Sequence, residues 1–532
     1  MNNNQYTYNQ PPMGQMMPPQ GGMMPPELPM PMSRRARMGQ RLMSGIALKM
    51  QGLPDWFATY AVATYAIALA GVSFVYSNYS MEWYFMLFGI VWVAGFFFLS
   101  IKYSRDWSMQ RVRKSKTFEK KLFLTGFLIR AAYAIFIYSF YMNMTGQPHE
   151  FQAGDSAFYM EIAGEDWMRF WDNGTLWAGI TEYAQNNFSD AGYPLFLLLP
   201  IRIFGLDASY VIIRLIHALF GAYTAVIIYR LTARSMGESI ARITAIFCML
   251  HPVLICYSGM ILKEVFMTWL VVVFIDIADR LLRSRKYTFS TIAPLVLIGF
   301  SLFLFRTVLG MIAFMAVFFA LLMMDTKIVS SGRKIVLGIV LAGILAMAAS
   351  DTIMREIRYV TETDVKEQQE KSLEYRYGEK KNSDKGLGNT FAKYAGAAVF
   401  APLIFTIPFP TMVNATIGQE DMRLIHGGNW MRNVMSGFVI LAMIMLLITG
   451  DWRKYTLPLA MMLGYLLMLA FTQFAHSLRF HIPVMPFEMM FAAYAIANMR
   501  RKHRNWYLIW CLVMVVACFA WNWFKLAGRG MT

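Results

Sequence analysis

The feature that most constrains this chain is a series of apolar runs, each about 20 residues long, which recur from residue 56 to residue 526. A helix of that length crosses the hydrocarbon core of a bilayer, and hydrophobic residues make up 57% of the sequence. We expect an all-α polytopic membrane protein with about 13 transmembrane helices. The predicted spans are 56–76, 83–101, 122–143, 208–230, 238–256, 260–282, 288–305, 307–325, 333–350, 430–449, 455–475, 481–498 and 505–526.

The basic residues indicate how the chain lies in the membrane. The sequence has 49 Lys and Arg against 32 Asp and Glu, and the basic residues gather in short loops on one side of the predicted spans, such as 102–121. Loops rich in Lys and Arg favour the cytoplasmic side of a membrane. We therefore place the amino terminus inside, read the net charge as a sign of topology, and expect membrane lipids but no nucleic acid among the partners.

Composition divides the chain into five segments. Residues 1–50 combine a disordered cytoplasmic tail with a basic amphipathic segment, and 51–121 hold two spans. Residues 122–350 form a central group of spans that includes the first outer loop, 144–207; a large outer loop, 351–429, and the spans of 430–532 follow. Tryptophans at helical spacing in the first outer loop predict helices that lie along the bilayer surface. Prolines between 394 and 412 predict a re-entrant or surface-lying segment there.

Two carboxylates fall at the predicted outer surface. The run Gly154-Asp155-Ser156-Ala157-Phe158-Tyr159 places Asp155 just after a predicted span. A carboxylate there can take a proton from an acceptor group, and its alternative is a helix cap. Glu264 lies near the outer end of an apolar span, where an ionisable group is costly and is usually functional or paired.

Three cations occupy similar positions at predicted outer ends of spans, namely Arg479, Arg306 and Lys263. A guanidinium can grip phosphate oxygens with two hydrogen bonds, and prolines that follow Arg479 favour it as a phosphate ligand. Snorkelling to the interface is the alternative for each cation. His481 flanks Arg479, whereas Arg214 lies deeper in a span and is expected to pair with an acid.

The acids after Asp155 raise the question of a metal. Glu161 and Glu165 are spaced to share a helical face, and together with Asp155 they could bind a divalent cation, Mg²⁺ or Mn²⁺. A solvated helical face is the alternative.

Five motifs follow one another in a recognisable order. They are the Asp155 run, the apolar segment Tyr193 to Pro200, Ile212-Ile213-Arg214-Leu215-Ile216-His217, the segment Ser258 to Glu264, and Arg479-Phe480-His481-Ile482-Pro483-Val484-Met485-Pro486. Together they resemble the GT-C superfamily of membrane glycosyltransferases, in the branch of protein O-mannosyltransferases and lipid A aminoarabinose transferases, which is like glycosyltransferase family 39. The resemblance covers about 122–350 and 479–486. Two extra spans precede the core, and Asp-Ser replaces the paired acids of many relatives.

The resemblance implies a GT-C-like fold and inverting transfer of a hexose or pentose from a polyprenyl-phosphate donor to a glycan, lipid or protein. It implies an active site on the outer face of the membrane, for which we favour a bacterial cytoplasmic membrane. Because a sugar on a lipid phosphate carries its own leaving group, the enzyme needs a base for the acceptor and cations for the phosphate. Asp155 is our candidate base, with Glu264 as its catalytic companion. Arg479, Arg306 and Lys263 are candidate phosphate ligands, and Tyr159, Glu161, Arg214 and His481 are candidate substrate or metal contacts.

Two other functions fit the same span pattern. A polysaccharide polymerase or ligase would place its key residues in 351–429, and a transporter or lipid flippase would use Glu264, Arg214 and Arg306 as a buried path. We find no internal repeat of the kind that many transporters show. The sequence also has no P-loop, His-Glu-x-x-His, Cys-x-x-Cys or dinucleotide-binding glycine pattern, which disfavours nucleotide-driven transport and zinc proteolysis.

Overall fold

The computed structural model describes residues 52–284, 289–324, 403–414, 420–471, 477–499, 503–527 and 531. Within these ranges the regular structure is helical, and an isolated antiparallel bridge joins Ser80 to Val413. The expected all-α class is therefore confirmed for the part of the chain that the structure describes.

The helices follow the order of the predicted spans. The first group is α2 (Asp55–Val75), α3 (Trp83–Asp106) and α4 (Ser115–Thr145). The first outer loop contains α5 (Gly154–Glu161), the π-helical turn η2 (Ile162–Asp166), α6 (Trp167–Asp172), α7 (Leu176–Asn186), the 3₁₀ turn η3 (Phe188–Asp190) and α8 (Gly192–Phe204). The central group is α9 (Leu206–Met236), α10 (Glu238–Leu250), α11 (Pro252–Ser258), α12 (Glu264–Arg283), α13 (Phe289–Phe305) and α14 (Thr307–Met323).

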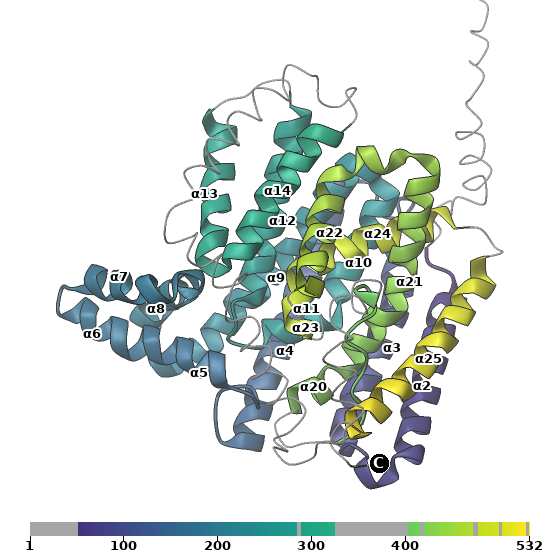
Figure 1. Ribbon diagram of the computed structural model, residues 1–532, viewed down its shortest axis with the longest axis horizontal. Coiled ribbons are helices and arrows are strands. Elements are labelled where there is room, and N and C mark those ends of the chain that lie inside the picture. The colour runs from purple at the N-terminus through teal and green to yellow at the C-terminus, as the bar shows by residue number, and fades with distance from the viewer. Residues whose placement is uncertain are drawn as a thin grey trace, which may run out of the picture.

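The last group lies alongside the first. It consists of α20 (Glu420–Leu424), α21 (His426–Thr449), α22 (Thr456–Phe471), α23 (Leu478–His481), the 3₁₀ turn η7 (Ile482–Val484), α24 (Met485–Asn498) and α25 (His503–Ala527). Figure 1 shows α25 beside α2, and the hydroxyl of Tyr507 donates to the carbonyl of Phe57 at 3.0 Å. In the same view α5 to α8 project to one side of the bundle. The two helices that precede the core are thus joined to the end of the chain.

Seven described helical segments are long and apolar enough to cross a membrane: α2, α3, α4, α9, α21, the continuous run Leu478–Asn498 and Arg504–Ala527. The bent pair of α10 and α11 makes an eighth. Four shorter apolar helices occur in α8, α13, α14 and α22, and α12 carries charged residues at both ends. The expected count of 13 is therefore not confirmed, and the predicted span 333–350 lies outside the described residues.

The span predicted at 238–256 is broken rather than straight, because α10 and α11 meet at 47°. Pro252 has no backbone N–H, so the carbonyl of Cys248 loses its helical partner. Arg130 of α4 replaces that partner, since its fully buried guanidinium donates to the carbonyls of Cys248 at 3.0 Å and Met249 at 2.9 Å. The break turns the chain so that α12 begins with Glu264 inside the bundle.

The first outer loop forms helices as predicted, but its aromatic residues divide between two environments. Trp167 is 1% exposed and its ring lies 5.6 Å from that of Tyr183, whereas Trp177 is 75% exposed. Only part of the aromatic pattern is therefore free to meet a bilayer surface.

The proline-rich end of the second outer loop enters the bundle without forming a span, because α21 and α25 bind its backbone. Asn433 donates to the carbonyl of Pro408 at 3.2 Å, and Asn522 donates to that of Pro410 at 3.1 Å.

Candidate active site

The centre of the candidate site is Arg479, which joins two carboxylates from distant parts of the chain. Its Nε donates to Glu264 at the start of α12, and its Nη1 donates to Asp155 in the first turn of α5. The side chains are 0% exposed for Glu264, 21% for Arg479 and 53% for Asp155. The arginine therefore connects a buried acid to one that solvent and a substrate can reach.

A second guanidinium approaches the same buried acid. Arg306 lies in the extended break between α13 and α14, and its Nη2 is 3.9 Å from Oε1 of Glu264. It also donates to the hydroxyl of Tyr465 at 3.1 Å, and it stacks over the ring of Phe480 with 4.5 Å between the guanidinium carbon and the ring centroid. These contacts hold the cation in place with its Nη2 directed toward Glu264.

Lys263 completes a row of three cations, although it faces a different acid. Its ammonium pairs with Asp190 of η3, which also accepts a hydrogen bond from the hydroxyl of Tyr159 at 3.1 Å. Burial raises the pKa of Tyr159, so this phenol remains protonated at neutral pH. The three cations, Arg479, Arg306 and Lys263, face three carboxylates, Asp155, Glu264 and Asp190, and the formal charges cancel.

A further pair of acids lies beneath α5. Burial raises the pKa of Glu150. The pKa of Asp421 is raised to about 7, mainly by burial and to a smaller extent by the charge of Glu150. Oδ2 of Asp421 accepts from the backbone N–H of Gln152 at 2.8 Å, while Oδ1 of Asp421 and Oε2 of Glu150 are buried without a hydrogen-bond partner among the described residues. The pair anchors the segment that leads into α5.

The same segment is fixed by His149, whose Nδ1 lies 3.0 Å from the hydroxyl of Ser156. Burial, reinforced by the charge of Arg214, lowers the pKa of His149 to about 4, so the imidazole is neutral at physiological pH. Ser156 follows Asp155 in the chain, and this contact therefore helps to set the position of the candidate base.

Arg214 lies outside the cluster. Its three nitrogens donate to the carbonyls of Gly259 at 2.7 Å, Tyr210 at 2.6 Å and Pro148, and its side chain is fully buried. The carbonyl of Gly259 lies just after α11, that of Pro148 follows α4, and that of Tyr210 lies within α9 itself, and together they accept hydrogen bonds from all three nitrogens. No ion pair between Arg214 and an acid occurs among the described residues, and its role as a substrate contact stays a prediction.

His481 also points elsewhere, because residues two apart on a helix do not face each other. Its Nδ1 lies 2.9 Å from Arg432, which pairs with Glu488 through two hydrogen bonds of 2.8 and 3.0 Å. His481 is 0% exposed. It belongs to a buried ion-pair network between α21 and α24 and not to the predicted site around Arg479.

The predicted divalent-cation site does not form from the residues proposed for it. Glu161 is exposed at the end of α5, and the π-helical turn that follows changes the register that would have brought Glu165 onto its face. No group of three His, Cys, Asp or Glu side chains within the described ranges is arranged to hold a metal ion. Asp155, Glu264 and Asp190 pair with cationic side chains instead, and a divalent cation stays a prediction.

Sequence reasoning missed Asp190, Tyr465, Glu150 and Asp421. Asp190 could have been found, since it lies three residues before the Tyr193-Pro194 motif. Tyr465 carries no sequence signal, because a tyrosine within an apolar helix is ordinary. Glu150 and Asp421 are 271 residues apart by number and become neighbours only through the fold.

Residues 176–361 are similar to the Alg9-like mannosyltransferase family. The matched range includes Asp190, Lys263, Glu264 and Arg306, and it ends before Arg479. No curated protein and no solved structure matches the chain. The matched family belongs to the superfamily expected from the motifs, although not to the branch that they resemble. The match over residues 176–361, together with the several apolar helices, supports a multi-pass membrane glycosyltransferase of the GT-C superfamily.

Proposed function

We propose that the chain transfers a sugar from a polyprenyl-phosphate donor to a glycan, lipid or protein acceptor at the extracytoplasmic face of a bacterial cytoplasmic membrane. The amino terminus is inside, and the transfer inverts the anomeric configuration. The name of the matched family makes mannose the first sugar to test. A hexose or pentose other than mannose remains within the proposal.

The bridge from Arg479 to Asp155 and Glu264 is the observation that carries this proposal. A lipid-linked sugar has a negatively charged phosphate, and a guanidinium can bind two of its oxygens. When that phosphate arrives, it competes with Asp155 for Arg479. Glu264 is buried and stays attached to the arginine, whereas the half-exposed Asp155 is free to leave.

Release of Asp155 gives it the role of general base. The acceptor hydroxyl attacks the anomeric carbon, the bond from that carbon to the phosphate oxygen breaks, and the electron pair departs with the phosphate. The acceptor proton passes to the carboxylate of Asp155. Arg479 and Arg306 stabilise the charge that grows on the phosphate, in a site where burial strengthens each interaction.

Lys263 and Asp190 form a smaller unit beside the reacting atoms. The ammonium of Lys263 is the third cation for the phosphate, and Asp190 holds it together with the phenol of Tyr159. Glu264 acts through the two guanidinium groups that it orients, those of Arg479 and Arg306.

The test is transfer from a panel of radiolabelled polyprenyl-phosphate sugars by the full chain in lipid. Asp155→Asn keeps the shape of the side chain but removes the base, and we expect turnover to fall by about 10² to 10⁴. Donor binding should be retained or tightened, because the neutral amide no longer competes for Arg479.

Asp166→Asn is the matched control, since Asp166 is 45% exposed, lies in the same loop and pairs with Arg169 at 3.1 Å. We expect its turnover to match that of the native chain. Equal turnover in Asp155→Asn would remove Asp155 as the base. Transfer from no donor in the panel would contradict the proposed function and would leave the polymerase and transporter hypotheses standing.

A further inference from the structure

A cavity of about 350 Å³ lies at the cytoplasmic-side ends of α2 and α3, as the topology above assigns them. It is far from the candidate active site. Glu264 begins α12 at that site, and the opposite end of the helix lies about 29 Å away for 20 residues. At that opposite end Arg234 of α9 pairs with Asp279, and Arg242 of α10 donates to the carbonyl of Trp107, just after α3. The cavity therefore lies at the other face of the bundle.

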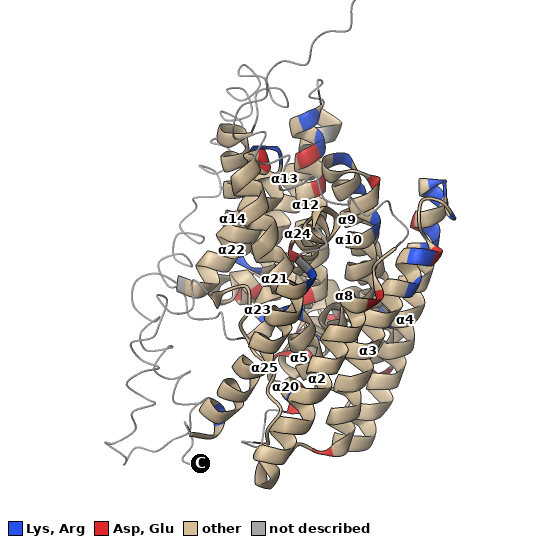
Figure 2. Ribbon diagram, turned by 90° about the vertical axis from the view of Figure 1, so that its right-hand side faces the viewer, with Lys and Arg blue, Asp and Glu red and all other residues tan. Residues whose placement is uncertain are grey.

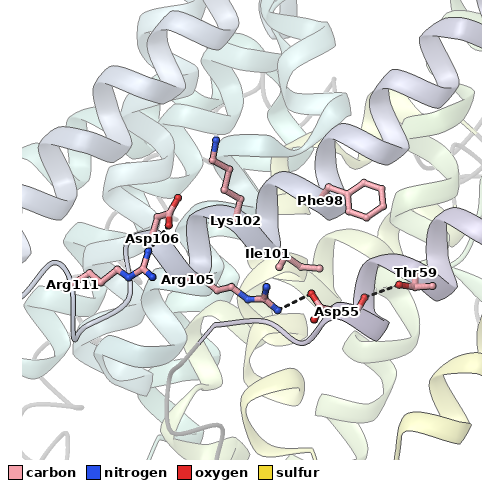
Figure 3. A pocket seen from close by; sticks show the side chains of 8 residues that line it. All are labelled: Asp55, Thr59, Phe98, Ile101, Lys102, Arg105, Asp106 and Arg111. Atoms are coloured by element: carbon pink, nitrogen blue, oxygen red, sulfur yellow. Dashed lines mark hydrogen bonds and ion pairs between the residues drawn. The ribbon is translucent and has the colours of Figure 1, made fainter.

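The polar half of the cavity contains three cations and two acids. Figure 3 shows Arg105 reaching across from α3 to Asp55 of α2, a contact of 2.8 Å, and Arg111 pairs with Asp106 at 2.6 Å. Lys102 is exposed and forms no ion pair with any residue that the structure describes. After the two acids are neutralised, one positive charge remains, and the two arginines keep unused N–H groups.

The position of Arg105 is fixed before any ligand binds. Besides Asp55, it donates to the carbonyl of Leu53 at 3.3 Å. Its stem lies against Gly52, where φ is +108° and an added Cβ would come within 2.4 Å of the Cγ of Arg105. A glycine permits both the backbone angle and the close approach. The cationic wall of the cavity is therefore pre-organised.

The other half of the cavity is apolar and opens toward the lipid. Phe98 is 52% exposed and lies on α3, seven residues before Arg105, which is about 10 Å along the helix. Ile101 lines the cavity between them. Charged groups at the membrane boundary with apolar groups about two turns deeper match the two parts of a phospholipid. Figure 2 shows further Lys and Arg residues at the same end of the bundle, around the start of α4.

We propose that this cavity binds the phosphate headgroup of an anionic phospholipid from the leaflet opposite the candidate active site. The ammonium of Lys102 pairs with the phosphate, Arg105 and Arg111 donate hydrogen bonds to its oxygens, and the acyl chains run along Phe98. The volume lies near the lower end of the range for ligand sites and suits a headgroup rather than a whole lipid. This site is independent of the sugar-transfer reaction.

Native mass spectrometry of the full chain in detergent tests the proposal by counting bound phosphatidylglycerol. Lys102→Gln should weaken the tightest binding event about fivefold, and Lys102→Gln with Arg111→Gln about 25-fold, since each cation near a headgroup contributes about 1 kcal/mol. The control is Lys116→Gln with Lys120→Gln, which removes two exposed charges from the same end of the bundle but outside the cavity. We expect this control to bind like the native chain.

If the control double variant lost as much phosphatidylglycerol affinity as Lys102→Gln with Arg111→Gln, the binding would reflect diffuse surface charge. That result would overturn the proposed site. Equal binding of phosphatidylcholine would overturn the requirement for an anionic headgroup. Binding of glycerol 3-phosphate as tight as that of phosphatidylglycerol, and equally weakened in Lys102→Gln, would assign the cavity to a soluble phosphate. That result would overturn the lipid as its ligand. The single variant keeps the test valid if the double variant folds poorly, because Lys102 is exposed and supports no described contact.

Discussion

At both ends of α12 carboxylates pair with arginines, but the two ends differ in how many of the carboxylate oxygens have a partner. At the carboxyl-terminal end Arg234 bridges Asp276 at 2.6 Å and Asp279 at 3.2 Å, and Arg280 and Arg283 take the remaining carboxylate oxygens at 2.8 Å each. All four oxygens are paired. At the amino-terminal end one oxygen of Glu264 has no partner in the part of the chain that the structure describes, and Arg479 binds both Glu264 and the half-exposed Asp155.

This difference separates a structural ion-pair network from one that is ready to react. A network with every oxygen paired would lose interactions if any member moved, so it fixes α9 against α12. The network around Glu264 has an exposed member that can be exchanged for a ligand and a buried member that cannot. The same chemical groups therefore act as a clamp at one face and as a candidate active site at the other.

Removing the bridging arginine at each end of α12 should have the largest effects, and they should differ in kind. Arg479→Gln should lower turnover by about 10³ or more, because it removes the main donor to the developing phosphate charge. Arg234→Gln should leave the kcat of the folded protein unchanged and lower the free energy of unfolding by about 2 kcal/mol. Turnover measurements and thermal unfolding of both variants in the same lipid provide the check.

Arg479→Lys distinguishes charge from geometry at the first end. A lysine keeps the positive charge but lacks the planar fork that holds Glu264 and the phosphate together, so we expect little recovery of turnover. Full activity in Arg479→Lys, or a loss of kcat in Arg234→Gln as large as that in Arg479→Gln, would contradict the distinction between the two ends.

Neutralising one acid at each end is a smaller perturbation. Glu264→Gln should lower kcat by about 10², because Arg479 and Arg306 lose the charge that orients them. Asp279→Asn should change kcat by less than about threefold but destabilise the fold by about 3 kcal/mol, since it leaves two arginines beside a neutral buried group. The measurements are kcat and the free energy of unfolding for each variant. A larger loss of kcat in Asp279→Asn than in Glu264→Gln would place the catalytic role at the carboxyl-terminal end of α12.

The residues of the candidate active site were easier to predict from the sequence than those of the ion-pair network at the carboxyl-terminal end of α12. Asp155, Glu264, Arg479, Arg306 and Lys263 each lie at the boundary of an apolar segment, where an ionisable residue is unusual. Their positions at that boundary could therefore be predicted, and the structure brings them together. The all-α class was equally accessible, because apolar runs of about 20 residues have few other outcomes in a bilayer.

What could not be predicted depends on the packing of distant segments. Arg214 looked functional because it is a charge within a span, yet three carbonyls from separate turns satisfy it. Glu161 was placed by α-helical periodicity, which the π-helical turn after α5 interrupts. The buried neighbours Glu150 and Asp421 depend on a contact between two loops that no local pattern records.

Substitution of Asp190 tests the candidate active site through a partial effect, on donor binding more than on the chemical step. Asp190→Asn should raise the KM for the donor about tenfold with a smaller change in kcat, because Lys263 loses the carboxylate that positions it. Steady-state kinetics with a varied donor concentration measure the effect. Asp172→Asn is its control, since Asp172 pairs with Arg202 at 2.9 Å elsewhere in the same outer loop. A fall in kcat with unchanged KM would place Asp190 in the chemical step instead.

The smallest expected effect concerns Glu150 and Asp421, two buried acids that lie close together. Neither Glu150 nor Asp421 forms an ion pair with any residue in the described ranges. The pKa of Asp421 is about 7 in the folded protein and about 3.9 in an unfolded chain, so the folded state binds more protons between these values. The free energy of unfolding should therefore fall as the pH rises from about 4 to about 7 and then level off.

Thermal unfolding of the native chain and of Asp421→Asn across this pH range isolates the contribution. The variant should have a shallower pH dependence, with a residual slope of the same sign from Glu150, whose pKa is also raised by burial. Asp166→Asn should keep the native slope, because Asp166 is exposed and already paired. An unchanged slope in Asp421→Asn would mean that this carboxylate is solvated or paired in the membrane. The buried acids of the loops would then resemble those of α12, which all pair with arginines.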